Sequence, residues 1–124
     1  ETITVRSIIG RFLEHGRIYV FANGGEFLSD KNIVMISSAD LMPRNLRRRV
    51  ECFMRLENPT IRKQVLHQIM VALLRDEKNS WYLQPDGSYV HPQTDETSFS
   101  CHEYFMSNPS LSGLGSLAAT QDND

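Results

Sequence analysis

The feature that most constrains the fold is an apolar stripe with helical spacing in the middle of the chain. Asn58 can cap a helix there, and Pro59 suits its first position. Apolar residues then recur every four positions, and a second row one position along widens the stripe. We therefore predict a helix from Pro59 to Leu74 whose apolar face packs on a sheet. The two rows are Ile61, Val65, Ile69 and Leu73, and Leu66, Met70 and Leu74.

Four segments have the composition of β-strands. Two alternate in character along the chain, one ends at an Asn-Gly-Gly turn signal, and one has an uninterrupted apolar run at residues 33–36. Such a run favours a strand that is covered on both faces, as in the middle of an α/β sheet. The strands are expected at residues 2–9, 17–22, 32–37 and 49–57.

The C-terminal third of the chain carries weaker signals. Residues 80–91 predict a hairpin around a Pro-Asp-Gly turn, and residues 101–107 predict one or two helical turns. The last part of the chain is rich in Ser, Gly, Asn and Asp, which is typical of a polar terminal tail. We expect one domain over residues 1–106 and a tail over residues 107–124.

The composition is that of an ordinary globular domain, since 40% of the 124 residues are hydrophobic and 23% are charged. With a formal net charge of -2 the whole molecule does not attract nucleic acid, so no nucleic-acid partner is expected. Any anion site must come from local clusters of basic residues. Cys52 and Cys101 lie far apart and are expected to be free thiols in a reducing compartment.

The start of the chain suggests a longer parent protein. The first residue is Glu1 rather than Met, and strand-like sequence begins without a lead-in. No segment approaches the roughly 18 apolar residues of a membrane-spanning helix, and the N-terminus has no signal-peptide pattern. We expect a fragment of a longer cytoplasmic protein.

His15 and Arg17 are the first candidate pair for chemistry. In an extended segment, residues two apart share a face, so both would lie on the same side as Tyr19. An imidazole can donate, accept or attack, and a guanidinium binds phosphate oxygens in a fork, so the pair suits phosphoryl chemistry. Spacing alone favours the simpler interpretation, a surface histidine beside an exposed arginine.

Polar side chains follow the strand expected at residues 32–37. Ser37, Ser38 and Asp40 would stand at its carboxyl end, which is where ligands bind in open α/β sheets. Hydroxyls and a short acid at this place can hydrogen-bond to an imidazole and fix which nitrogen carries its proton. The alternative is that Asp40 caps the next helical turn, and the two roles are compatible.

Four arginines come next, at positions 44, 47, 48 and 49. If residues 41–48 are helical, Arg44 and Arg48 share a face and Arg47 lies beside Arg44. Runs of basic residues are usually solvated, but without acidic neighbours their charges repel, and an anionic ligand would relieve that repulsion. We expect at least one of these arginines to line an anion site and others to be exposed.

The remaining histidines are weaker candidates. His67 is expected to be a packing or surface residue. Cys101 and His102 are neighbours in sequence and would not face one another in a strand or helix, so they predict no catalytic dyad. The sequence has no glycine-rich phosphate loop, nucleophile elbow or zinc-ligand spacing.

The pattern His-x-Arg at residues 15–17 and Ser-x-Asp at residues 38–40 resembles a phospholipase D-type half-site, with Arg for Lys and Asp for Asn. More specifically, the ordered blocks GRFLEHGRIYVFANGG, ISSADLMPRNL and RRVE are similar to the C-terminal catalytic domain of bacterial polyphosphate kinases of the first family. The segment EYFMSNPSLSG is similar to the C-terminal end of that family. The resemblance covers residues from about 2 to about 113.

This resemblance implies an α/β fold, a phospholipase D-like half-domain with a mixed sheet and packed helices, in a C-terminal fragment of a larger protein. It implies reversible transfer of the terminal phosphate of ATP to inorganic polyphosphate, through a phosphohistidine that lies upstream of this chain. Residues 1–106 would then be the C-terminal catalytic domain of such a kinase.

The same resemblance implies the cofactor and the partners. Mg²⁺ would act with ATP, and its ligands are expected outside this fragment. The partners would be ATP, ADP, inorganic polyphosphate and the rest of the kinase chain, which is expected to form a homo-oligomer at full length. A cytoplasmic location is expected, and the family allows a peripheral association with the inner membrane.

Roles for individual residues follow from the resemblance. His15 matches the second histidine of the family, which binds the phosphates of the nucleotide and assists the transfer. Arg17 and Arg49 match phosphate-binding positions, and we add Arg44 from the basic cluster. Ser38 and Asp40 are expected to support the site, and no metal ligand is expected within the fragment.

Two other functions stay open. The first is a phospholipase D-like phosphodiesterase or nuclease half-site, against which Arg17 and Asp40 argue because they replace lysine and asparagine. The second is a non-catalytic module that binds polyanions through Arg44 to Arg49. The fragment alone is expected to be inactive, because phosphoryl transfer needs a nucleophile, a metal and a closed cationic tunnel, and only part of the tunnel is here.

Overall fold

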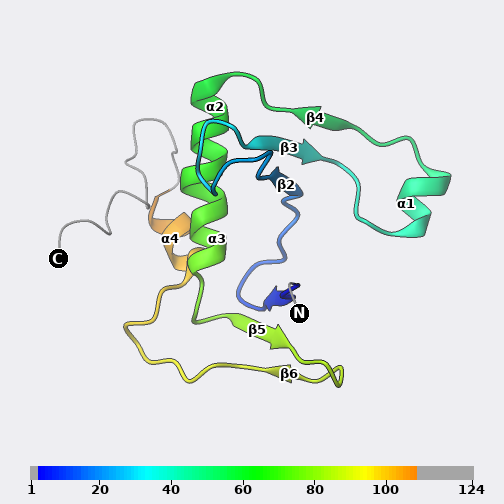
Figure 1. Ribbon diagram of the computed structural model, residues 1–124. Coiled ribbons are helices and arrows are strands. Elements are labelled where there is room, and N and C mark those ends of the chain that lie inside the picture. Colours follow the sequence, from blue (N-terminus) through cyan, green and yellow to red (C-terminus); the bar gives the residue numbers. More distant parts are fainter. Residues whose placement is uncertain (1–2, 109–124) are drawn as a thin grey trace. The chain divides into compact units, whose positions relative to one another are not determined.

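Pairing of short antiparallel strands organises the computed structural model, which describes residues 3–108 (Figure 1). The strands form two three-stranded sheets. One sheet belongs to a unit of residues 15–70, and the other to a unit that combines residues 3–14 with residues 71–108. From residue 109 onward, the predicted polar tail lies outside the described residues.

The sheet of the first unit contains β2 (Ile18–Phe21), β3 (Ile33–Ser37) and β4 (Phe53–Arg55) in the order β2-β3-β4. Both pairings are antiparallel. The uninterrupted apolar run is thus the central strand, as predicted. Of the five residues of β3, all of them described, Val34 is buried and the other four are partly buried. The expected mixed sheet is wrong for residues 3–108, because the β2–β3 connection is a loop rather than a helical crossover.

The loop between β2 and β3 is closed by one buried side chain. The amide of Asn32, which is 1% exposed, donates to the carbonyl oxygens of Ala22 at 3.2 Å and Glu26 at 2.8 Å. Asn23 and Gly24 have φ angles of 51° and 75°, the left-handed conformation that the Asn-Gly turn signal predicts. The turn therefore forms where the sequence indicates it.

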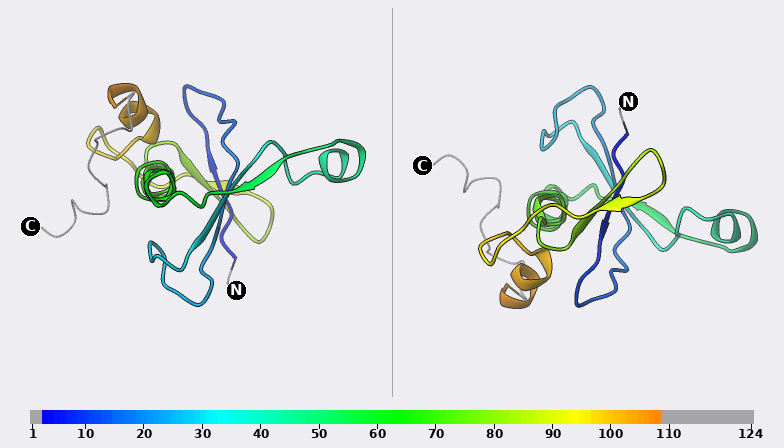
Figure 2. Two further views of the ribbon diagram at one scale, coloured as in Figure 1. Left: turned by 90° about the horizontal axis from the view of Figure 1, so that it is seen from above. Right: turned by 90° about the horizontal axis from the view of Figure 1, so that it is seen from below.

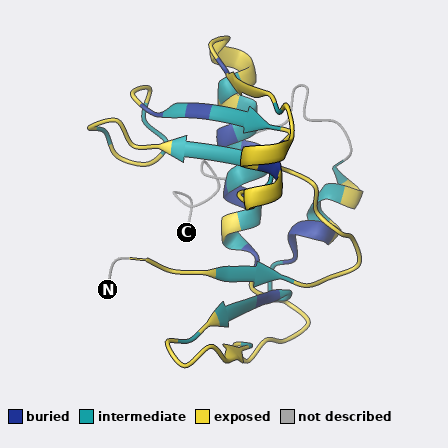
Figure 3. Cartoon of the chain, turned by 90° about the vertical axis from the view of Figure 1, so that its right-hand side faces the viewer, coloured by how far each residue is buried: buried dark blue, intermediate teal, exposed yellow. Residues whose placement is uncertain are grey.

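The first helix, α1 (Pro43–Arg48), follows β3 and is almost entirely exposed (Figure 3). Its N-cap residue is Met42, with no capping hydrogen bond from a side chain, so the expectation that Asp40 caps this helix is wrong. Asn45 is its one buried residue. Within this unit, α1 lies at the opposite end of β3 and β4 from α2 (Figures 1 and 2).

The predicted central helix begins as expected and is wound in three consecutive elements, α2 (Pro59–Gln64), the π-helix η1 (Val65–Met70) and α3 (Val71–Arg75). The side chain of Asn58 caps it by accepting from the backbone N–H groups of Thr60 at 3.0 Å and Ile61 at 3.2 Å. The first two elements belong to the unit of residues 15–70, and α3 belongs to the other.

Part of the apolar stripe packs on the sheet, as predicted. Leu66 forms the core of residues 15–70 with Val34 and Leu56. Ile61 and Leu74, however, are 48% and 50% exposed. A π-helix takes more residues per turn than an α-helix, so a four-residue spacing does not keep one face across η1. The stripe is therefore longer than the buried face.

The second unit contains β1 (Arg6–Ile8), β5 (Ser80–Leu83) and β6 (Tyr89–Val90), in the antiparallel order β1-β5-β6. The predicted hairpin over residues 80–91 is confirmed, and α4 (Cys101–Ser107) confirms the short helix. The guanidinium of Arg6 donates to the carbonyl oxygens of Leu73 at 2.6 Å and Leu74 at 2.8 Å. Arg6 thus satisfies the last carbonyls of α3.

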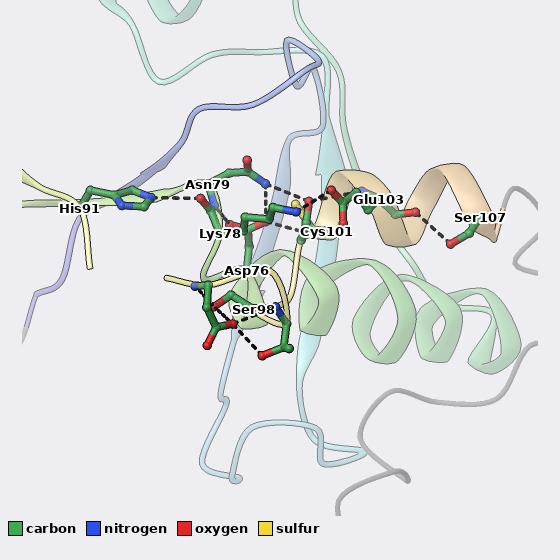
Figure 4. A network of polar contacts seen from close by, with 11 residues as sticks. Asp76, Lys78, Asn79, His91, Ser98, Cys101, Glu103 and Ser107 are labelled. Carbon is green, nitrogen blue, oxygen red and sulfur yellow. Dashed lines mark hydrogen bonds and ion pairs between the residues drawn. The ribbon is translucent and has the colours of Figure 1, made fainter. Parts of the chain in front are cut away.

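Asp76 connects the elements of this second unit (Figure 4). It is 1% exposed and accepts from the backbone N–H groups of Asn79 and Cys101, both at 2.8 Å. Burial by itself raises the pKa of this carboxyl, but the hydrogen bonds from Cys101 and Asn79 outweigh it, and the pKa is lowered. A buried carboxylate therefore holds the start of α4.

Both cysteines are free, as predicted. Cys101 is buried, and burial together with the nearby Asp76 raises the pKa of its thiol to about 12. It is therefore protonated and unreactive at neutral pH. Among residues 3–108, no helix is long and apolar enough to cross a membrane.

Replacing Asp76 by Asn should lower the free energy of unfolding by about 1–3 kcal/mol, because charged hydrogen bonds to buried N–H groups are weakened. Since the pKa of Asp76 is lowered in the fold, its stabilisation is present above the ordinary carboxyl pKa of about 3.9 and is lost as the pH falls through the lowered value. Urea titrations at pH 7 and pH 3 measure both effects. Asp30→Asn, at a fully exposed carboxylate, is the control. Equal stability of both variants at pH 7 would contradict this role.

Candidate functional site

The β2–β3 hairpin brings the segment of residues 15–17 next to residues 37–40. The backbone N–H of Ser37 donates to the carbonyl oxygen of Arg17 at 3.0 Å, one step beyond the Ile18–Ile36 pair. Beyond the strands, Arg17 Nε donates to Asp40 Oδ1 at 2.8 Å. The two sequence motifs, predicted separately, therefore meet at one end of the hairpin.

The His15–Arg17 pair lies in the segment that leads into β2 rather than within the strand, because β2 begins at Ile18. Arg17 also donates from a terminal nitrogen to the carbonyl oxygen of His15 at 2.8 Å. Its guanidinium thus fixes both the backbone of residue 15 and the carboxylate of Asp40. The imidazole of His15 is exposed at this end of the sheet.

Asp40 is held as a carboxylate. The hydrogen bond from Arg17 lowers the pKa of Asp40, burial opposes it with a smaller effect, and the charges of Arg17, Arg44 and His15 lower it further. Asp40 therefore balances charge among three basic side chains. The hydrogen bond that the structure gives Asp40 goes to Arg17, so its predicted role in orienting an imidazole stays a prediction.

Ser38 lies in a second polar group, which joins β3 to the start of β4. Its hydroxyl donates to a carboxylate oxygen of Glu51 and accepts from the backbone N–H of Cys52 at 3.1 Å. The other oxygen of Glu51 accepts from the amide of Asn45 at 3.4 Å. These contacts connect α1 to the sheet.

Sequence reasoning missed Asn45 and Glu51. The repulsion argument for the arginine cluster assumes no acidic neighbours, whereas Glu51 accepts from Asn45 of α1, and Asn45 accepts from Arg44 Nε at 3.3 Å. The only available signal was an acid two positions after Arg49. That Ser38 would reach Glu51 depends on how β3 pairs with β4, which spacing does not reveal.

The four arginines of α1 and its C-terminus are all exposed, as most were expected to be. Arg47 and Arg48 stand in the last turn of α1, where cations are favourable, and Arg49 is its C-cap residue. With His15, Arg17 and two carboxylates, they form what we call the arginine end of the hairpin, defined by residues 15, 17, 40, 44, 47–49 and 51. Basic groups outnumber acids there, which favours anions.

A shallow hollow of about 140 Å³ opens at the carboxyl end of β3, lined by Ile36, Ser37, Ser38, Cys52 and Met54. It lies at the strand end where the sequence predicted a site. Among residues 3–108, no group of three or more His, Cys, Asp or Glu side chains is placed to hold a metal ion.

Comparison with known families gives a match over most of the chain. The family model for the polyphosphate kinase C-terminal domain 2 matches residues 1–102. A polyphosphate kinase of Erythrobacter litoralis is 57% identical over 115 residues, which cover 93% of this chain and 16% of that protein. One of Synechocystis is 48% identical over 107 residues, covering 85% of this chain and 14% of that protein.

A solved structure agrees with these sequence matches. The crystal structure of polyphosphate kinase from Porphyromonas gingivalis superimposes with a TM-score of 0.72 at 29% identity, covering 86% of this chain and 16% of that one. The chain thus spans about a sixth of the length of the proteins that it resembles.

Replacing Arg17 by Gln should raise the pKa of Asp40 towards the ordinary value of about 3.9, because its hydrogen bond and nearest positive charge are removed. The pair is intact above that ordinary value and is lost as the pH falls through the lowered pKa. Carboxyl ¹³C NMR titration measures the change. Arg47→Gln, at an exposed arginine of α1, should leave the pKa of Asp40 unchanged, and equal shifts in both variants would contradict the pairing.

Proposed function

The chain belongs to the polyphosphate kinase family, through the C-terminal domain 2, and from that premise we propose that it supplies part of the active site of a polyphosphate kinase. In this proposal the parent protein, the longer kinase of which the chain is a part, transfers the terminal phosphate of ATP reversibly to inorganic polyphosphate. Residues 1–106 form its phospholipase D-like half-domain. The observation that carries the proposal is the contact of Arg17 with Asp40 and with the backbone of His15, at the strand end from which α1 and its exposed arginines follow.

Each side chain has a distinct role in this proposal. His15 is exposed at the arginine end of the hairpin, where an imidazole can bind a phosphate oxygen or donate a proton to it. Arg44 and Arg49 bind phosphate oxygens, for which a guanidinium offers a fork of donors. Arg17 holds the backbone of His15 and the carboxylate of Asp40. Its remaining N–H groups bind a phosphate oxygen while those two contacts persist.

Ser38 and Asp40 support the site through their contacts. Asp40 fixes Arg17, and Ser38 fixes Glu51, which in turn holds the buried Asn45 of α1. The helix that carries Arg44 is therefore tied to the same strand end as Arg17. Because these side chains are held in place before the substrate binds, less entropy is lost in bringing them into the reactive geometry.

The phosphohistidine and the cofactor are placed elsewhere in the parent protein. Mg²⁺ bound to ATP would neutralise phosphate charge, and the described residues offer no cluster of three ligands for it. ATP, ADP and polyphosphate are the proposed partners, together with the rest of the chain in a homo-oligomer. The cytoplasmic location, with peripheral attachment to the inner membrane, also belongs to this proposal.

Replacing His15 by Gln in the parent protein should lower kcat for polyphosphate synthesis about 10²- to 10⁴-fold, the range for loss of an acid or base. His91→Gln is the matched control, since His91 contacts the carbonyl oxygen of Lys78 in the other unit. Steady-state assays with ATP and polyphosphate measure both variants. Unchanged activity of His15→Gln would contradict the catalytic role.

His15→Gln, together with two arginine variants, distinguishes the alternative of a module that only binds polyanions, which the exposed arginines favour. In that case Arg44→Gln and Arg49→Gln would weaken salt-dependent binding of polyphosphate, while His15→Gln would leave kinase activity intact. Hydrolysis of a phosphodiester by the parent protein would instead support a phospholipase D-like half-site.

The isolated chain of 124 residues should not be phosphorylated by labelled ATP and Mg²⁺, because the proposed nucleophile lies outside it. Acid-labile phosphate on the protein is the quantity to measure, with the parent protein as the positive control. Labelling of the isolated chain at a histidine would contradict the placement of the nucleophile upstream.

A further inference from the structure

A pocket of about 280 Å³ lies at the other end of the β2–β3 hairpin, between the loop and the helix of the same unit. The strands pair over four residues, from Ile18 with Ile36 to Phe21 with Ile33. This pairing separates the two ends by roughly 10 Å along the strands. The pocket is therefore distinct from the arginine end of the hairpin. Its lining residues are Leu28, Ser29, Asp30, Pro59, Arg62, Lys63, Leu66 and His67.

Two contacts make the pocket a built feature of the fold. Arg62 donates to the backbone carbonyl oxygens of Asp30 at 2.9 Å and Asn32 at 3.3 Å, which ties α2 to the loop. The buried amide of Asn32 donates to Ser29 Oγ at 3.2 Å and so holds the loop from the inside. The wall of the pocket is thereby fixed on both sides.

Irregular backbone lines the pocket from both walls. Leu28 has a φ angle of 72°, a left-handed conformation that a bulky residue rarely adopts. Leu66 and His67 belong to the π-helical η1. Both irregularities are energetically unfavourable, and both are found more often at functional sites than elsewhere. Their convergence on one pocket favours a function for it.

The charges of the lining favour an anion. Lys63 and His67 both line the pocket, and Arg62 adds a second fixed positive charge. The single carboxylate, that of Asp30, is fully exposed and 3.5 Å from Arg62. Burial, and then the charge of Lys63, lower the pKa of His67, as expected in a partly closed basic pocket.

The size and the polar groups indicate the class of ligand. A volume of about 280 Å³ is just below the range of about 300–1,000 Å³ that is usual for drug-sized ligands, so the pocket suits a small group. The hydroxyl of Ser29 accepts from Asn32 and, like any hydroxyl, can also donate. Donors of this kind with a lysine and a histidine suit the oxygens of a phosphate group. We propose that this pocket binds a phosphate group of a small molecule, at a second site that goes beyond the proposed function.

Chemical protection of Lys63 tests the proposal in the unmodified parent protein. Acetic anhydride acetylates exposed lysines, and mass spectrometry gives the rate at each one. Inorganic pyrophosphate at ten times its dissociation constant should slow acetylation of Lys63 about tenfold, because only about one site in ten is then left empty and free to react. Lys31, on the same loop but outside this lining, is the internal control and should be unaffected.

Further arms make every outcome decisive. Sodium chloride at equal ionic strength should not protect Lys63. Protection by pyrophosphate, with or without protection by ADP, supports a site for phosphate alone, and protection by ADP only supports a nucleotide phosphate. Equal slowing at Lys63 and Lys31, or no slowing with either compound, would overturn the proposal.

Substitution of the pocket gives a second, independent measurement. Calorimetric titration of the parent protein with pyrophosphate should lose one class of sites in Lys63→Gln, and Lys31→Gln should retain it. His15→Gln should also retain this class, which separates the pocket from the proposed active site. Retention of all classes in Lys63→Gln would overturn the proposal.

Discussion

Antiparallel pairing of β2 with β3 is the constraint on which the functional features of residues 15–70 depend. The register that pairs Ile18 with Ile36 places Arg17 opposite Ser37, and from there Arg17 reaches Asp40. At the opposite end, the same pairing creates the loop held by Asn32. A shift of one residue would turn every side chain of β2 to the other face and separate Arg17 from Asp40.

Hydrogen bonds at the arginine end of the hairpin hold two carboxylates close to several positively charged side chains. His15, Arg17 and the arginines of α1 would repel one another, and Asp40 and Glu51 reduce that repulsion at fixed places. Because both carboxylates are engaged by neighbouring side chains, the exposed arginines keep an excess of positive charge at the surface. The proposed function relies on such an excess, because exposed arginines are accessible to a long anion such as polyphosphate.

The sequence predicts those elements that local chemistry determines. Asn58 and Pro59 mark the start of the central helix, Asn23 and Gly24 mark a turn, and the apolar run marks the central strand. It does not reveal that β3 pairs antiparallel with β2 and β4, since apolar runs are compatible with either direction. The π-helical turn was also missed, because the spacing of apolar residues is the same whether or not one turn is wider.

The candidate site follows the same division. His15, Arg17, Ser38 and Asp40 are recognisable as motifs, but only strand pairing shows that Arg17 and Asp40 bind one another. Asn45 and Glu51 carry no motif of their own and become visible through contacts between α1, β3 and β4. The structure therefore adds hydrogen-bond partners to residues that the sequence had already identified, and membership of the family supports the function proposed for them.

A double-mutant cycle on Arg17 and Asp40 tests most directly the claim that their contact organises the proposed active site. kcat/KM for polyphosphate synthesis by the parent protein is measured for Arg17→Gln, Asp40→Asn and the double variant. Because the two residues are in direct contact, the account predicts strong coupling, with the double variant losing little more than the more damaged single variant. If the losses instead multiply, the two residues act independently, and the central claim is contradicted.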